Sequence, residues 1–183
     1  MTVATLPKAG TWSIDPSHSS VEFVVRHLVV SKVKGRFGTF AGTVSLDPAA
    51  PLAASVGATL QVASIDTGDA QRDTHLRSAD FFDAETYPTI TFRSTAVRQA
   101  GDDFDVDGDL TIRGVTKPVS LRLEYNGTSP DPWGGTRAGF SGETELNRRD
   151  FGLDFDVKLD TGGALVGEKI KIHLEVETIL QAA

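Results

Sequence analysis

The stretch Lys169-Ile170-Lys171-Ile172-His173-Leu174-Glu175-Val176-Glu177 alternates strictly between polar and apolar side chains. Because successive side chains of a β-strand point to opposite faces, it predicts a strand with one buried and one exposed face. The same alternation recurs upstream in residues 106–112, 119–125 and 138–146. We therefore expect an all-β, antiparallel fold.

The chain contains about eight such segments, separated by Gly, Pro, Asp and Asn. One connection is short: Gly101-Asp102-Asp103 joins residues 90–97 to residues 104–112, which predicts a hairpin. About eight antiparallel strands are enough to close a barrel whose interior holds one elongated ligand. The alternative is a barrel filled by its own side chains that acts only as an interaction scaffold.

Length and charge limit the possible functions. At 183 residues the chain fits one domain over residues 1–183, and residues 1–10 are expected to form a flexible tail. The net charge of -7 offers no overall attraction to nucleic acid or to anionic membranes. Cysteine is absent, which excludes disulfides, thiolate catalysis and cysteine metal sites.

The N-terminus lacks a basic start followed by an apolar run, so no signal peptide is predicted. No stretch approaches the ~18 consecutive apolar residues that a membrane-spanning helix needs. We therefore expect a cytoplasmic protein without a membrane-spanning segment.

Residues 69–83 interrupt the alternation with the dense block Arg72-Asp73-Thr74-His75-Leu76-Arg77-Ser78-Ala79-Asp80-Phe81-Phe82-Asp83. Asp69 in front of it predicts a short capped helix, on which Arg72 and His75 are neighbours. Because an arginine fork suits phosphate or carboxylate oxygens, this pair is a candidate for binding a polar head group. The alternative is a structural network of ion pairs with the nearby aspartates.

Two further residues are head-group candidates. His27 shares a strand face with Val21, Phe23 and Val25, and a polar ring at the end of an apolar row suits an amphiphile. The alternative is a core histidine satisfied by the backbone. Arg149 and Asp150, in the motif from Asn147 to Gly152, are expected to close a strand end through a buried ion pair or to contribute to the mouth of the barrel.

The sequence contains no motif for a metal site, a cofactor or a catalytic residue, and metal binding is possible only if distant strands converge. The histidines at positions 18, 27, 75 and 173 lack the short spacings of zinc sites, and no Gly-x-Ser-x-Gly motif is present. The competing hypothesis is an enzyme that uses His27 or His75 as a general base on a substrate held in the barrel.

A series of motifs follows in order along nearly the whole chain. They are Trp12-Ser13-Ile14-Asp15-Pro16-Ser17-His18 through His27, Gly35-Arg36-Phe37 with Phe40 and Gly42, Ser64-Ile65-Asp66-Thr67-Gly68, Arg72-Asp73-Thr74-His75-Leu76, Asp80-Phe81-Phe82-Asp83, Tyr87-Pro88-Thr89-Ile90-Thr91-Phe92, Gly108-Asp109-Leu110-Thr111-Ile112-Arg113-Gly114-Val115-Thr116, and Asn147-Arg148 through Gly152. In this order the series resembles the YceI-like family, and the ordered set is highly specific.

The resemblance implies a lipocalin-like, extended antiparallel barrel, often a dimer, that holds a polyisoprenoid or related long-chain amphiphile. No enzyme activity is generally established for the family. We therefore expect non-enzymatic binding, sequestration or transport of an isoprenoid diphosphate, a quinone or another lipid.

The candidate residues follow from the strand faces together with this implied function. Those expected to line the apolar interior are Phe23, Val25, Phe37, Phe40, Phe92, Leu110 and Phe140. Those expected at the head group are His27, Arg72, His75 and Arg149. Gly42, Gly108 and Gly142 are expected to leave space in the interior.

Overall fold

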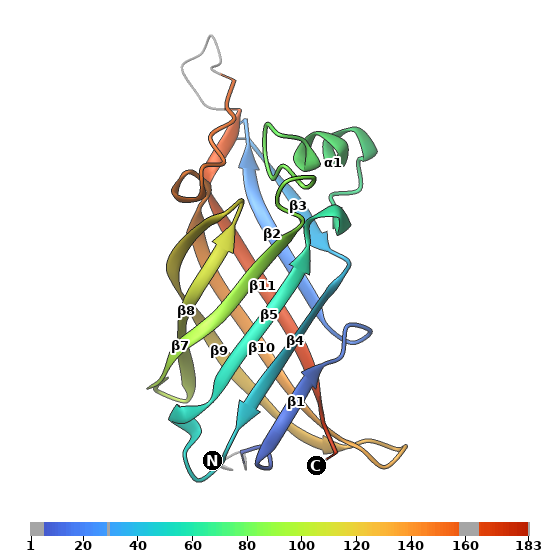
Figure 1. Cartoon of the computed structure of the whole chain (residues 1–183), viewed down its shortest axis with the longest axis vertical. Coiled ribbons are helices and arrows are strands. Elements are labelled where there is room, and N and C mark those ends of the chain that lie inside the picture. The colour runs from blue at the N-terminus through green and yellow to red at the C-terminus, as the bar shows by residue number, and fades with distance from the viewer. Residues whose placement is uncertain (1–5, 29, 158–164, 183) are drawn as a thin grey trace.

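A computed structural model describes residues 6–28, 30–157 and 165–182, which form an antiparallel β-barrel with one short helix (Figure 1). The strands are β1 (Gly10–Ile14), β2 (Ser20–His27), β3 (Ser31–Phe37), β4 (Phe40–Leu46), β5 (Ser55–Gln61), β6 (Ile65–Asp66), β7 (Thr89–Ala100), β8 (Asp103–Ile112), β9 (Val115–Pro130), β10 (Thr136–Asn147) and β11 (Val166–Leu180). The helix is α1 (Ala70–Arg77), and the 3-10 turns are η1 (Pro51–Ala53), η2 (Val62–Ser64) and η3 (Arg148–Phe151). No helix of the described residues is long and apolar enough to cross a membrane.

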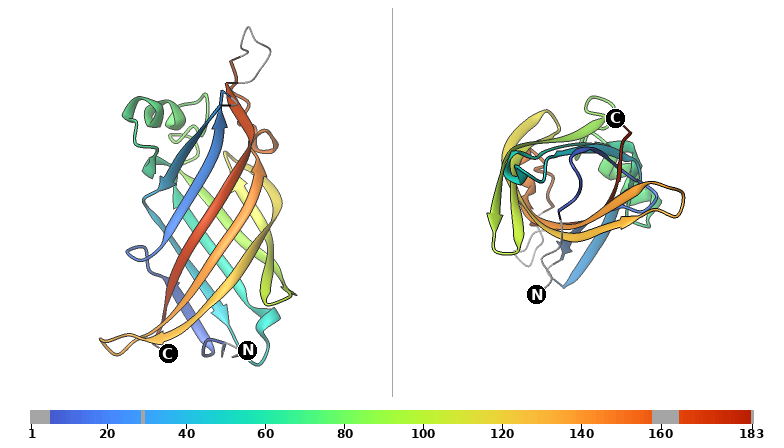
Figure 2. Two further views of the ribbon diagram at one scale, coloured as in Figure 1. Left: turned by 180° about the vertical axis from the view of Figure 1, so that it is seen from behind. Right: turned by 90° about the horizontal axis from the view of Figure 1, so that it is seen from below.

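Eight strands close the barrel in the order β1-β4-β5-β7-β8-β9-β10-β11, and β1 pairs with β11 to complete the ring. Figure 2 shows this ring from below. Strands β2, β3 and β6 extend the sheet beyond β11 at the upper end. The expected all-β, antiparallel barrel of about eight strands is therefore confirmed.

The alternation in the last strand has the predicted consequence. Ile170, Ile172, Leu174 and Val176 of β11 face the interior of the barrel, and Lys171 between them is exposed. The predicted β7–β8 hairpin is present at Gly101, whose φ of 72° favours glycine. The helix also forms where its cap predicted it, because the Asp69 side chain accepts a hydrogen bond from the Arg72 amide at 2.9 Å.

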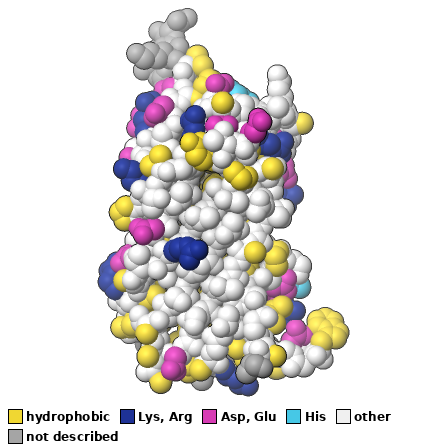
Figure 3. Space-filling model, in the orientation of Figure 1, with side chains coloured by type: hydrophobic (Ala, Val, Ile, Leu, Met, Phe, Trp, Pro, Cys, Tyr) yellow, Lys and Arg dark blue, Asp and Glu magenta, His cyan; other side chains and the backbone are white. Residues whose placement is uncertain are grey.

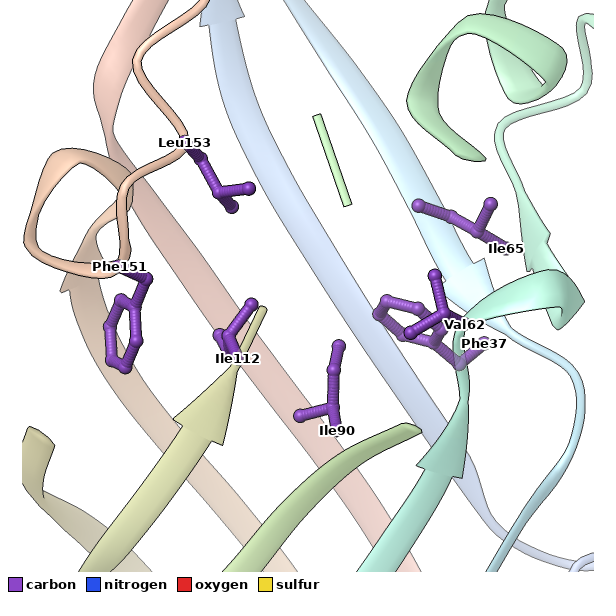
Figure 4. Packing of buried hydrophobic residues seen from close by; sticks show 7 residues of the cluster. All are labelled: Phe37, Val62, Ile65, Ile90, Ile112, Phe151 and Leu153. Carbon is purple, nitrogen blue, oxygen red and sulfur yellow. The ribbon is translucent and has the colours of Figure 1, made fainter. Parts of the chain in front are cut away.

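The larger of the two clusters of buried hydrophobic side chains lies in the upper part of the barrel, and the smaller one consists of Phe92, Val97 and Val106. Figure 4 shows seven hydrophobic side chains that point inward there from strands, turns and the segment after η3. They are Phe37, Val62, Ile65, Ile90, Ile112, Phe151 and Leu153. Leu76 and Phe82 from α1 and its following loop pack against them, so this segment covers the upper end.

Arg148 is a buried charge at this upper end, with a relative exposure of 4%. Its guanidinium donates hydrogen bonds to the carbonyl oxygens of Phe155 at 2.9 Å, Gly167 at 3.0 Å, Val166 at 3.1 Å and also Leu153. Burial lowers the pKa of Arg148 from its usual value. One side chain thus joins the segment after η3 to the start of β11.

An ion-pair cluster holds the opposite end. Arg137 of β10 donates to Asp15 at 2.7 Å, to Asp131 at 2.7 Å and to Glu177. These carboxylates come from the β1–β2 connection, the β9–β10 connection and β11. The cluster therefore ties three segments together at the lower end.

The N-terminal residues also contribute to the lower end. Leu6 and Pro7 line the interior of the barrel, and the Trp12 indole donates to the Lys8 carbonyl oxygen at 3.1 Å. Within the segment expected to form a flexible tail, Leu6 and Pro7 thus contact the barrel and Gly10 begins β1. Residues 1–5 of that expected tail lie outside the described residues.

We predict that Arg148→Met lowers the free energy of unfolding by about 3–5 kcal/mol, because the buried carbonyls lose a charged donor. Arg149→Met is the matched control, since this neighbouring arginine is half-exposed and its ion pairs contribute about 1 kcal/mol or less. Urea unfolding of both variants measures the difference. Equal losses in the two variants would contradict the role assigned to Arg148.

Asp15 gives a prediction for pH dependence. Hydrogen bonds from Ser17, His18 and Arg137 hold the pKa of Asp15 well below its usual range. Because the folded-state pKa is lower than the unfolded one, this stabilisation is present above about pH 4 and is lost as the pH falls further. Asp15→Asn is expected to flatten the decline of the urea midpoint between about pH 5 and pH 2.

Asp102→Asn, at an exposed position in the β7–β8 turn, is the control for that titration. The urea midpoint of this control variant should depend on pH in the same way as that of the wild type. If Asp15→Asn also leaves it unchanged, the Arg137 cluster does not couple protonation to folding.

Candidate functional site

An apolar cavity of about 310 Å³ runs along the inside of the barrel. Leu6, Leu46 and Pro51 line it at the lower end, and Leu76 and Leu153 line it at the upper end. Its volume lies at the lower limit of the ~300–1,000 Å³ typical of ligand sites. The cavity can therefore take an elongated apolar group that lies along the barrel axis.

The cavity wall is built from the inward faces of the strands. All seven residues expected to line the interior lie in this wall: Phe23, Val25, Phe37, Phe40, Phe92, Leu110 and Phe140. They come from six different strands, so no single segment forms the cavity. Strand parity places them there, since each belongs to the apolar half of an alternating segment.

Glycines in the wall are covered by neighbouring side chains. A Cβ atom added to Gly35 would lie 2.3 Å from Cζ of Phe23, and one added to Gly108 would lie 2.4 Å from Cζ of Phe92. The glycines therefore do not themselves leave space, contrary to the expectation for Gly108. Instead they let two large rings lie against the strands, which keeps the centre of the barrel open.

Two head-group candidates lie on or next to α1. Arg72 is exposed, and it donates from Nε to the Thr67 hydroxyl at 2.7 Å and from Nη2 to the Thr67 carbonyl at 3.1 Å. Nε2 of His75 lies 2.9 Å from Oδ2 of Asp80. Neither side chain is part of the cavity wall among the described residues. Their role at a head group stays a prediction.

The other two candidates, His27 and Arg149, are also at the upper end. His27 ends β2 and pairs with Val166 of β11, which does line the cavity. Arg149 forms ion pairs with Asp156 at 3.1 Å and Glu168 at 2.8 Å. Both therefore lie close to the cavity end without belonging to its described wall.

Arg148 is the functional candidate that the sequence reasoning missed, because it is the charged residue whose side chain lies in the cavity wall and is buried. The alternation of the strand before Arg148 already indicated that its side chain points inward. Ala138, Phe140, Gly142, Thr144 and Leu146 share the inward face of β10, and two residues further along the same parity reaches Arg148. Arg149 then falls on the other face.

Aromatic contacts join the two segments that cover the upper end of the cavity. The His75 ring contacts Phe81 and Phe155 edge-on, with centroid distances of 5.1 and 4.8 Å. Phe81 and Phe155 are themselves 4.9 Å apart. The loop after α1 and the segment after η3 therefore meet through these rings.

The lower end holds the one group of potential metal ligands found among the described residues. Ligand atoms of Asp15, His18 and Glu177 lie within 4.8 Å of one another. The Arg137 guanidinium, however, already binds Asp15 and Glu177. We therefore interpret the group as an ion-pair cluster whose cation is Arg137.

Comparison with known proteins agrees with this architecture. A model of the YceI-like domain matches residues 12–178. Protein YceI from Escherichia coli O17:K52:H18 (strain UMN026 / ExPEC) is 42% identical over 175 residues, which cover 94% of this chain and 88% of that protein.

Solved structures show the same barrel. The crystal structure of Burkholderia cenocepacia BcnA matches with a TM-score of 0.77 at 28% identity, covering 90% of this chain and 98% of that one. A polyisoprenoid binding domain from Saccharophagus degradans shares the fold, with a TM-score of 0.70 at 16% identity over 93% of this chain and 98% of that one. Because the family model spans nearly the whole barrel and a curated relative is 42% identical, the chain belongs to the YceI-like family.

Proposed function

We propose that this protein binds one long apolar chain, most simply a polyisoprenoid, inside the barrel and carries or sequesters it without chemical change. The observation that carries the proposal is the continuous apolar wall from Leu6 at one end to Leu153 at the other. A short or globular ligand would leave much of such a cavity empty. An isoprenoid tail has the matching length and polarity.

The energetics favour recognition of the tail. Each methylene moved from water into the cavity contributes about 0.8 kcal/mol before the costs of ordering the ligand. A wall without an exposed polar group offers no hydrogen bond to a head group, so a polar head is expected outside the cavity. The polyisoprenoid-binding relative of the same fold supports this ligand class.

The upper end is the proposed position of the head group. His27, His75 and Arg149 lie there, and all three carry hydrogen-bond donors suited to phosphate or carbonyl oxygens. Arg72 is on the same helix as His75. An isoprenoid diphosphate or a quinone would meet these groups once its tail fills the barrel.

Binding without catalysis is part of the proposal. A general base must reach the reacting atom within about 3.2 Å or through one water, and neither His27 nor His75 lines the described cavity. Incubation with prenyl diphosphates, alcohols and quinones should therefore return each compound unchanged in mass spectrometry. A new product that disappears in His27→Gln or His75→Gln would support the enzyme hypothesis instead.

Residence in the cytoplasm and assembly as a homodimer are the finer parts of the proposal. The face of the barrel over β4, β5 and β7 carries few charged side chains (Figure 3), and such a face suits contact with a second copy. Light scattering on the purified protein measures the mass in solution, and cell fractionation measures the location.

Ala58→Trp tests the cavity directly. Ala58 of β5 lines the cavity, so an indole there would occupy the space of the tail while the empty volume limits the strain. We predict that the affinity for a polyisoprenol falls about tenfold or more, equal to about 1.4 kcal/mol. Lipid extraction and mass spectrometry of the natively purified protein give a second readout.

Ala41→Trp is the matched control, because Ala41 on the neighbouring strand β4 pairs with Thr59 and is exposed on the outer face. It should retain lipid as the wild type does. If Ala58→Trp folds and still retains lipid at the wild-type level, the lumen is not the binding site.

Arg149→Met tests the head-group position. If Arg149 contacts the head, the substitution should weaken binding of a prenyl diphosphate by about tenfold while binding of the matching prenyl alcohol changes little. The affinity of Arg72→Ala for the same two lipids is measured in the same way. Its melting temperature is measured as well, because Arg72 also donates a hydrogen bond to Thr67. Equal losses for both lipids would assign these arginines to structure alone.

A further inference from the structure

The β2–β3 connection presents apolar side chains to solvent at the end of the barrel opposite both termini (Figure 1). Leu28 is 38% exposed and Val30 is 87% exposed. Hairpin connections usually carry Gly, Asn or Asp, which suit solvent and tight turns. We call Leu28 and Val30 the apolar tip.

The backbone at this tip is strained. Leu28 has a φ of 51°, a left-handed conformation that is unfavourable for a leucine. Its amide donates to the Leu165 carbonyl oxygen at 3.1 Å, which anchors the turn to the chain just before β11. Strain that persists in a surface segment points to function, because a glycine or asparagine would relieve it.

Cations lie directly behind the apolar tip. Lys32 and Lys34 of β3 are exposed, and they pair in register with Arg26 and Val24 of β2. Lys171 of β11 is exposed on the other side of Val24. Neither Lys32 nor Lys34 forms an ion pair with the described part of the chain. This local basic patch contrasts with the net charge of -7.

The tip adjoins the end of the lipid cavity. Val25 lines the cavity two residues before His27, and His27 pairs with Val166, which also lines it. Val157, which precedes an undescribed segment at the same end, is 47% exposed. A lipid that leaves the cavity at this end would therefore meet the apolar tip first.

We propose that the apolar tip and the lysines behind it dock the upper end of the barrel onto an anionic phospholipid bilayer. Leu28 and Val30 would enter the boundary between head groups and acyl chains, and Lys32 and Lys34 would contact anionic head groups. The charge pattern commits the occupant to a bilayer, because an apolar end backed by lysines that form no ion pair with the described residues is complementary to an anionic lipid surface. The purpose of docking, exchange of lipid with the cavity, rests on the proposed function.

Flotation with vesicles tests the docking. The probes are vesicles of phosphatidylcholine alone and vesicles with about one third phosphatidylglycerol, both without added isoprenoid. The wild type should float with the anionic vesicles, less with the neutral ones, and less at higher salt. Val30→Ser and the double substitution Lys32→Glu with Lys34→Glu should each lower the affinity about tenfold or more.

Trp133→Ser is the matched control for the apolar tip. Trp133 is also 87% exposed but lies in the β9–β10 connection at the other end, and tryptophan is itself a good membrane anchor. Lys8→Glu, near the N-terminus, is the control for charge. Both should bind vesicles as the wild type does.

The same variants separate docking from ligand binding. Val30→Ser should bind a prenyl alcohol delivered in detergent with wild-type affinity but take it up more slowly from vesicles. The docking proposal is overturned if the wild type does not bind anionic vesicles, which is the result expected for a protein acceptor. It is also overturned if the tip variants bind vesicles like the wild type, or if Trp133→Ser loses as much vesicle affinity as they do. Vesicle binding without lipid uptake would reject the carrier function alone.

Discussion

The five-residue strand β1 hydrogen-bonds to β4 on one side and to β11 on the other. This seam is the constraint on which the barrel depends, because an open sheet would expose unpaired edges and the apolar inner faces of its neighbours. Trp12, at the centre of β1, is only 1% exposed and pairs with Val44 and Leu180. Closure and burial are therefore achieved by the same short segment.

The side chains of this closed barrel do not occupy the whole of its interior. Strands β9 and β11 have 16 and 15 residues, whereas the main cluster of buried side chains occupies only the upper part of the interior. The rings of Phe23, at the edge of this cluster, and of Phe92 lie over Gly35 and Gly108. The positions of the glycines thus leave the interior partly empty. A cavity too apolar to hold water favours an apolar ligand.

Sequence periodicity predicted the barrel and its wall because both depend on local parity alone. The alternating apolar residues of β11 from Ile170 to Val176 and each expected lining residue face the interior. Periodicity did not predict the partners of Arg72, since Thr67 becomes its acceptor only when α1 folds back beside β6. Nor did it separate Arg148 from Arg149, because β10 ends at Asn147 and both arginines lie in the 3-10 turn that follows. Extending the parity of β10 by two residues would have done so.

The two ends of the barrel differ in how their charges are satisfied. At the lower end, the carboxylates of Asp15, Asp131 and Glu177 converge on Arg137, so the charges are internal to the fold. At the upper end, Arg148 is satisfied by backbone carbonyls and Lys169 pairs with Glu145 at 2.8 Å, whereas Lys32 and Lys34 form no ion pair with the described residues. A protein of net charge -7 therefore keeps two exposed lysines on β3, beside the cavity-lining strand β2. The elongated ligand proposed above would therefore meet different charged groups at the two ends of the barrel.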